Sequence, residues 1–283
     1  MTEIITTLED VRLIAALEAN LEEEMMNFGR VLAGAEVYND GEIEGFYTGR
    51  GHLNGILRTH LRHSDPESVK QSIDRALAYF RAKKVGEIGW SVGQDCQPAR
   101  LAAYLERLGF SKLDEENVGM ALDMAAMRVE EGHVEGLEIR ELLELKDLNV
   151  LRKMEIEGFG SSEVMAGYYC EMYENAGFGP GSHWRHLGGW WRGEVVAATS
   201  LLFHAGVAGI YGVATVPHAR QRGIARALVL RAISIARQAD YRIAILSPTD
   251  MSEGIYRRLG FREYTRIRHY TRELPSLSAT GGL

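Results

Sequence analysis

The sequence contains one structural pattern twice, and this repeat limits the folds that are open to it. The later copy has an amphipathic helix over residues 224–240, an apolar strand over 242–246 and a short helix that ends at Gly260-Phe261. The earlier copy repeats this order over 67–83 and 87–92, with a helix that ends at Gly109-Phe110. Helical spacing followed by a short apolar run indicates an α/β unit, and self-similarity indicates two such units. The sequence therefore predicts two copies of one αβ module.

The join between the modules is predicted from a polar, glycine-containing stretch. A chain of 283 residues is long enough for two small domains. We expect a first domain over residues 1–128, a linker over 129–136, a second domain over 137–275 and a flexible tail over 276–283.

Several further elements are expected. In the first module we predict a helix over 8–26, strands over 31–38, 43–47 and 55–61, a hairpin turn at Asn39-Asp40-Gly41, and a closing strand over 118–124. In the second module we predict a strand over 137–142, helices over 143–157 and 163–175, and strands over 183–191, 194–204 and 207–216.

A basic turn (residues 217–223) joins the last of these strands to the helix over 224–240. Pro217 ends the strand because it has no N–H for a ladder. The first turn of a helix leaves about four N–H groups unpaired and carries about half a positive charge, so it attracts anions. Gly223 allows a close approach of the backbone, and Arg220, Arg222 and Arg226 add positive charge. The turn lacks the Walker and dinucleotide fingerprints, but it suits a phosphate.

Two motifs resemble the GNAT acetyltransferase superfamily. Arg220-Gln221-Arg222-Gly223-Ile224-Ala225 is similar to its pyrophosphate signature, and Tyr256 to Phe261 is similar to its Y-x-x-x-G-F ending. The resemblance covers about residues 137–273. It implies an α/β (α+β) fold of two acyl-CoA N-acyltransferase modules, each a mixed, mostly antiparallel sheet flanked by helices. The first module would be a degenerate copy.

The resemblance also implies an activity and a site. A primary amine would attack acetyl-CoA directly in a ternary complex, without an acyl-enzyme. The family's cofactor contacts fall on the central strand and the basic turn, at Val213, Ala214, Thr215, Val216, Arg220, Gln221, Arg222, Gly223, Ile224, Ala225 and Arg226. Tyr256 would protonate the departing thiolate, since a phenol with a pKa of about 10 can give a proton to a thiolate whose conjugate acid has a pKa of about 8–9.

The general base and the acceptor pocket stay open. Glu157, Glu163, His204, Asp250 or a water chain are the alternatives for the base. Aromatic side chains that could line an acceptor site are Phe159, Tyr168, Tyr169, Tyr173, Phe178, Trp184, Trp190 and Trp191, although helical spacing favours core packing for Tyr169 and Tyr173. Cys96 and Cys170 are expected to be core residues rather than nucleophiles.

The first module lacks both chemical motifs. At the start of its long helix, Ser64 or Asp65 is a good N-cap and Pro66 suits the first helical position, so no free N–H groups remain for a phosphate. Leu105 stands at the position of Tyr256. We therefore expect a structural first module.

Composition narrows the remaining classes. A net charge of −7 disfavours nucleic-acid binding. The pairs His60/His63 and His183/His186 lack metal-site spacing, so no metal is expected. No apolar run is long enough to span a membrane and no leader is evident, so we expect a cytoplasmic protein that is a monomer or homodimer. The expected partner is a small-molecule or peptide amine; the alternative is a non-catalytic acyl-CoA-binding or interaction protein.

Overall fold

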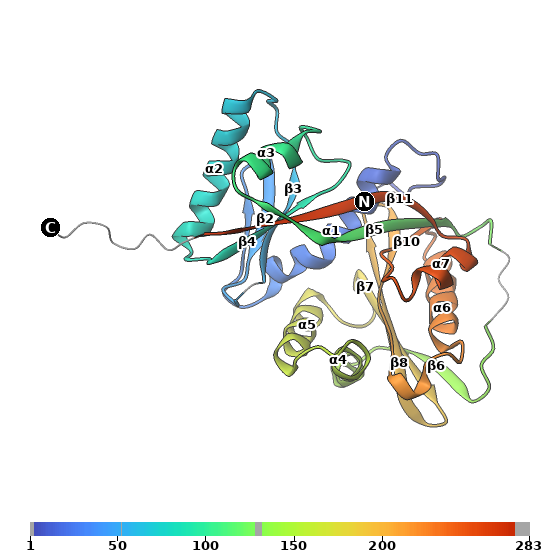
Figure 1. Ribbon diagram of the computed structural model, residues 1–283. Helices are drawn as coiled ribbons and strands as arrows, with labels where there is room; N and C mark the ends of the chain where they lie inside the picture. The colour runs from blue at the N-terminus through green and yellow to red at the C-terminus, as the bar shows by residue number, and fades with distance from the viewer. Residues whose placement is uncertain (1–2, 52, 128–131, 275–283) are drawn as a thin grey trace. The chain divides into compact units, whose positions relative to one another are not determined.

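The computed structural model describes residues 3–51, 53–127 and 132–274, which form two compact units (Figure 1). The basic-turn unit contains residues 3–21 and 119–264, and the β1–β4 unit contains residues 22–118 and 265–274. Each unit is a mixed, mostly antiparallel sheet with helices packed against it, which confirms the predicted fold class. No helix in the described part of the chain combines the length and apolar character needed to cross a membrane.

The sheet of the basic-turn unit places the basic turn at the end of a central strand. Its order is the end of β5 (Ser111–Asp123), β10 (Ile243–Leu246), β9 (Val207–Thr215), β8 (Glu194–His204), β7 (Trp184–Trp191) and β6 (Leu137–Leu142). All neighbours are antiparallel except β9 and β10, which are parallel.

Helices cover both faces of this sheet. On one face, α6 (Ile224–Gln238) packs so closely on β7 that a Cβ on Gly189 would lie 3.1 Å from Leu228. On the other face, a π-helix (Met154–Gly158) follows α4 (Leu148–Lys153), and a Cβ on Gly158 would lie 2.9 Å from that of Ala214 on β9. Side chains alternate along a strand, so the register places these two contacts on opposite faces. The unit also contains α5 (Glu163–Ala176) and α7 (Glu253–Leu259).

The β1–β4 unit has the same plan. Its order is β1 (Glu36–Asn39), β2 (Ile43–Tyr47), β3 (Asn54–Thr59), β4 (Glu87–Val92) and the end of β11 (Arg262–Glu273). The helices α2 (Pro66–Ala82) and α3 (Leu101–Arg107) supply apolar faces to a core that includes Ile73, Phe80, Trp90, Leu105, Phe110 and Tyr270. The remaining helix, α1 (Leu13–Val31), passes from one unit into the other.

Two long strands, β5 and β11, each begin in one unit and end in the other. The end of β5 pairs with β10, from Asp123 opposite Ile243 to Met120 opposite Leu246. The end of β11 pairs with β4, with Glu273 opposite Glu87. The predicted domains 1–128 and 137–275 follow the order of the sequence. The compact units do not, because 119–123 belongs to the basic-turn unit and 265–273 to the β1–β4 unit. The tail 276–283 and part of the linker 129–136 lie outside the described residues.

Most predicted elements have their expected bounds, and the differences have local causes. β2, β4, β6 and β8 match the predicted ranges. The helix predicted over 8–26 instead runs from Leu13 to Val31, because Met26 and Phe28 continue its buried face. The strand predicted over 31–38 is the shorter β1, Glu36–Asn39. The helix predicted over 143–157 is interrupted: a 3₁₀ turn (Leu145–Asp147) precedes α4 and the π-helix follows it.

Candidate active site

The basic turn leads into a helix whose start has no side-chain cap. After β9, a 3₁₀ turn (Pro217–Ala219) leads to Gly223, the N-cap of α6, which has the left-handed φ of 80°. A Cβ at Gly223 would meet nothing closer than Val134, at 3.6 Å. A glycine cap offers no side-chain acceptor, so within the described ranges the first N–H groups of α6 receive no bond from their N-cap side chain and can bond water or a ligand.

The three arginines around the turn occupy different positions. Arg220 is bound to the backbone: its Nε donates to the Thr215 carbonyl at 3.0 Å and its Nη2 to the Gly158 carbonyl at 2.9 Å. This arginine therefore ties the end of β9 to the π-helix, rather than standing free as a phosphate ligand. The guanidinium carbon of Arg222 lies 4.6 Å from the centre of the Trp191 ring. Arg226, in the first turn of α6, lies beside Gly132.

The strand before the turn has one edge that diverges from its neighbour. Between its pairs at Tyr211 and Ala214, β9 has one residue more than β8, and Gly212 has a φ of 58° there. Among the described residues β9 pairs with β10 only at Ala208 and Gly209. Beyond these pairs, the residues predicted to contact the cofactor through their backbone, Val213 to Val216, lie on an edge that β10 does not cover. A bulge that re-aims a strand beside an unpaired edge is suited to backbone recognition of a ligand.

Tyr256 is buried and stays protonated. Only 6% of the residue is exposed, and burial raises the pKa of its phenol to about 12. The ring lies 5.9 Å from that of Phe261, edge to face. Gly260 ends α7 with a φ of 102°, which turns Phe261 back so that its N–H donates to the Tyr256 carbonyl at 3.1 Å. The Gly-Phe pair thus fixes Tyr256, and a protonated phenol can act only as a proton donor at neutral pH.

The four candidate bases lie on different elements of the basic-turn unit. Glu157 and Glu163 are exposed and pair with Lys153, at 3.8 Å, and with Arg152. Asp250 is exposed before α7, and His204 ends β8. Glu157 directly precedes Gly158, which packs against Ala214 on the strand with the diverging edge.

The sequence interpretation missed the half-buried carboxyl of Glu155, two residues before Glu157 in the π-helix. Burial raises the pKa of Glu155, while a hydrogen bond from Ser161 Oγ at 3.1 Å favours its charged form. A π-helix is a feature that often marks functional sites. The amphipathic pattern does not indicate a π-helix here. The one sequence signal is Gly158, because a larger residue would collide with Ala214 where the π-helix meets β9.

An aromatic cluster on the α5 face contains much of the predicted acceptor lining. His186 stacks on Phe178 and Trp184, with ring centres 4.8 and 5.9 Å away, and meets the edge of Tyr173 at 4.6 Å. Burial lowers the pKa of His186 to about 3, and its Nδ1 lies 2.8 Å from Ser200 Oγ. These rings pack as a core, as predicted for Tyr173.

Histidine positions do not indicate a metal. His183 is exposed while His186 is buried, and His60 pairs with Asp95 at 2.9 Å. Within the described ranges no three His, Cys, Asp or Glu side chains are grouped to hold a metal ion. Of the two cysteines, Cys96 is buried, and burial raises the pKa of the half-buried Cys170 thiol.

The corresponding positions of the β1–β4 unit are closed. Asp65 caps α2 by accepting from the Ser68 N–H at 2.9 Å, and Pro66 is at the first helical position, as predicted. The diverging edge is also filled. β3 pairs with β4 at Gly55 and Ile56, and beyond this the chain's own Gln97 is inserted. The Gln97 N–H donates to the Thr59 carbonyl at 2.8 Å, and its carbonyl accepts from the Leu61 N–H at 3.0 Å.

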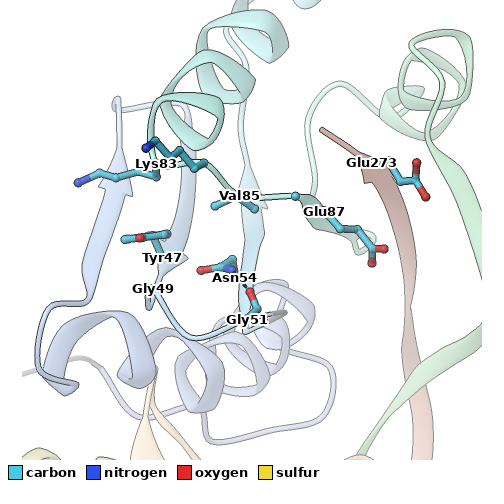
Figure 2. Close-up of a pocket in the computed structure, with 10 residues that line it drawn as sticks. Tyr47, Gly49, Gly51, Asn54, Lys83, Val85, Glu87 and Glu273 are labelled. Atoms are coloured by element: carbon cyan, nitrogen blue, oxygen red, sulfur yellow. Dashed lines mark hydrogen bonds between the residues drawn. The ribbon is translucent and has the colours of Figure 1, made fainter. Parts of the chain in front are cut away.

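A hollow of about 500 Å³ in this unit lies at the opposite end of α2 from Asp65. It is lined by residues of the β2–β3 loop, the α2–β4 connection and the end of β11; Figure 2 shows Tyr47, Asn54, Lys83, Glu87 and Glu273 around it. It lies away from the positions that correspond to the basic turn.

The bulged strand, the glycine-capped helix start and the Tyr-Gly-Phe turn all belong to one unit of the fold, the basic-turn unit. In agreement, residues 204–264 match the model of the acetyltransferase (GNAT) domain. The family model covers α6, β10, α7 and the basic turn.

Solved structures extend the likeness to the whole chain. A GCN5-related N-acetyltransferase from Kribbella flavida has a TM-score of 0.72 at 16% identity, covering 94% of this chain and 97% of its own. A tandem GNAT protein from the clavulanic acid biosynthesis pathway has a TM-score of 0.67 at 14% identity, covering 98% and 99%. A GCN5-related N-acetyltransferase from Sphaerobacter thermophilus has a TM-score of 0.65 at 17% identity, covering 86% and 77%. At these identities the likeness shows the fold. No curated protein matches the sequence significantly.

Proposed function

We propose that this protein transfers the acetyl group of acetyl-CoA to a primary amine, and that the basic-turn unit carries the site. The observation that carries this proposal is the continuity of three features: the uncovered edge of β9, the basic turn, and the glycine-started α6. An extended pantetheine arm can pair with a strand edge, and a pyrophosphate suits the helix start that follows it.

The residues suggest the following steps. The backbone of Val213 to Val216 binds the pantetheine arm, and an N–H there polarises the thioester carbonyl. A neutral amine attacks the carbonyl carbon, forming the C–N bond; the C–S bond then breaks and its electron pair goes to sulfur. Tyr256 gives its proton to the thiolate, while the proton lost by the amine passes to a base. Glu157, Glu163, His204, Asp250 and a water chain remain the candidates, and the half-buried Glu155 joins them.

The first sequence module is proposed to be structural. Asp65 occupies the helix start, Gln97 fills the strand edge, and Leu105 is buried at the position of Tyr256. All three changes oppose cofactor binding. We further propose a cytoplasmic enzyme, monomeric or homodimeric, that acts on a small-molecule or peptide amine and does not bind nucleic acid.

The alternative function is a non-catalytic acyl-CoA-binding or interaction protein of the same fold. Tyr256 discriminates the two, because cofactor binding alone has no use for a buried, protonated phenol beside the site. We expect Tyr256→Phe to lower kcat by about tenfold or more, as for the loss of a general acid, while KM for acetyl-CoA changes little.

Tyr241→Phe is the matched control, since Tyr241 is also partly buried, with its pKa raised by burial, but stacks on Phe203 before β10. Acetylation of an amine panel, followed by release of free CoA thiol, is the assay. Wild-type protein that binds acetyl-CoA without turnover on any amine would support the alternative.

A further inference from the structure

The hairpin between β7 and β8 meets the basic turn in a cluster of one indole and two arginines. We define the indole–arginine cluster as Trp191, Arg192 and Arg222. The guanidinium carbons of Arg192 and Arg222 lie 4.7 and 4.6 Å from the centre of the Trp191 ring. Arg222 belongs to the basic turn, whereas Trp191 ends β7 and Arg192 begins the tight turn to β8. The cluster therefore joins two segments that are far apart in the sequence.

Two residues of the cluster, Trp191 and Arg192, are held in place by hydrogen bonds to backbone carbonyls. The Trp191 indole N–H donates to the Glu135 carbonyl at 3.0 Å, and the Arg192 N–H donates to the Gly136 carbonyl at 2.9 Å. Arg192 has a φ of 53°, the left-handed conformation that its place in the hairpin turn requires. A Cβ on Gly136 would lie 3.5 Å from Arg192 Cγ, so the stem of the arginine is packed as well.

The two guanidiniums differ from other arginines of the same unit in their partners. Arg140, Arg185 and Arg242 each pair with a carboxylate, from Glu138, Glu141 and Asp123 respectively. For Arg192 and Arg222, no carboxylate of the described residues lies within ion-pair distance. Stacking on an indole occupies the faces of a guanidinium and leaves its N–H edges available. Two such edges, that of Arg192 on a packed stem, match the forked hydrogen bonds that a phosphate accepts.

The position of the cluster indicates which phosphate it would hold. Arg222 directly precedes Gly223, where the proposed function places the pyrophosphate of acetyl-CoA. Coenzyme A carries one further phosphate, the monoester on its ribose 3′ carbon, which has a charge of about −1.5 to −2 at neutral pH. Resting on the proposed function, we propose that the indole–arginine cluster binds this 3′-phosphate. The site would then select free coenzyme A thioesters over pantetheine thioesters that lack the 3′-phosphate.

The test compares two ligands that differ only in that group. Calorimetric titration with coenzyme A and with 3′-dephospho-coenzyme A gives a ratio of affinities. We expect the wild-type protein to bind coenzyme A at least about tenfold more tightly, the effect of losing charge-assisted hydrogen bonds. Arg192→Gln should lose most of this preference by weakening coenzyme A alone, with 3′-dephospho-coenzyme A unaffected.

Arg231→Gln is the control, because Arg231 is an exposed arginine two turns along α6 and its substitution changes the net charge equally. It should keep the wild-type ratio. Equal affinities for the two ligands in the wild type, or an Arg192→Gln variant that weakens both ligands alike, would overturn the inference while leaving the proposed function intact. Binding of neither ligand would overturn both.

Discussion

His186 gives the protein an acid sensitivity that can be worked out from its surroundings. The side chain is 0% exposed, and burial lowers its pKa from 6.5 to about 3. In the unfolded chain the imidazole takes a proton as the pH falls below 6.5, whereas in the folded state it stays neutral until about pH 3. Protons therefore favour the unfolded state over this window, and stability is full above pH 6.5 and is lost as the pH falls toward 3.

The magnitude follows from the two pKa values. Each pKa unit corresponds to about 1.36 kcal/mol, so the full window corresponds to about 5 kcal/mol and the part above pH 5 to about 2 kcal/mol. This is a large share of the ~5–15 kcal/mol that holds a typical domain folded.

Urea unfolding at pH 7.5, 6 and 5 measures this pH-dependent contribution of His186 to the free energy of unfolding. The reference is the double variant His186→Phe/Ser200→Ala, which removes both partners of the Nδ1–Oγ contact and so leaves neither polar group unpaired. We expect the stability of the wild type, relative to this variant, to fall by about 2 kcal/mol between pH 7.5 and 5. Parallel pH dependences of the two proteins would refute the reasoning, because all other titrating groups are shared.

Two further substitutions test how the two modules have diverged. Arg220→Gln removes the link between Thr215 and Gly158, so we expect KM for acetyl-CoA to rise about tenfold with a smaller change in kcat; an unchanged KM in steady-state kinetics would contradict this. Asp65→Ala removes the cap of α2 and should lower the midpoint temperature by a few degrees without changing kcat. The pKa of Asp65 is lowered from 3.8 mainly by the Ser68 N–H, so its stabilisation is present above pH 3.8 and is lost as the pH falls below it; a difference in midpoint temperature that does not shrink as the pH is lowered from 3.8 would contradict this.

Much of the fold could be predicted from the sequence because turns, helix caps and amphipathic faces each depend on a few neighbouring residues. Asn39-Asp40-Gly41 forms the hairpin, with the Ile43 N–H donating to Asp40 at 2.8 Å, and Gly260 takes the left-handed C-cap. The start of α6 at Ile224 follows from Gly223 and the helical spacing after it. Each of these features depends on a turn, a cap or a periodic face.

Features that depend on distant partners were not predicted. The bounds of β11 are hidden by its many charged residues, and the burial of its Tyr270 is explained only once Trp90 of β4 is known to lie opposite it. For the same reason the exchange of strand ends between the units gave no sequence signal. The role of Arg220 as a link between backbone carbonyls also required the π-helix, which periodicity did not reveal.

We propose that only one of the two modules binds the cofactor, and a calorimetric titration of acetyl-CoA read for stoichiometry measures this. We expect one site per chain, abolished by Gly223→Glu and kept by Gly181→Glu, a control at a glycine with a similar positive φ of 87°. Two sites per chain would mean that the first module binds despite Asp65 and Gln97, and no binding would remove the proposed enzyme altogether.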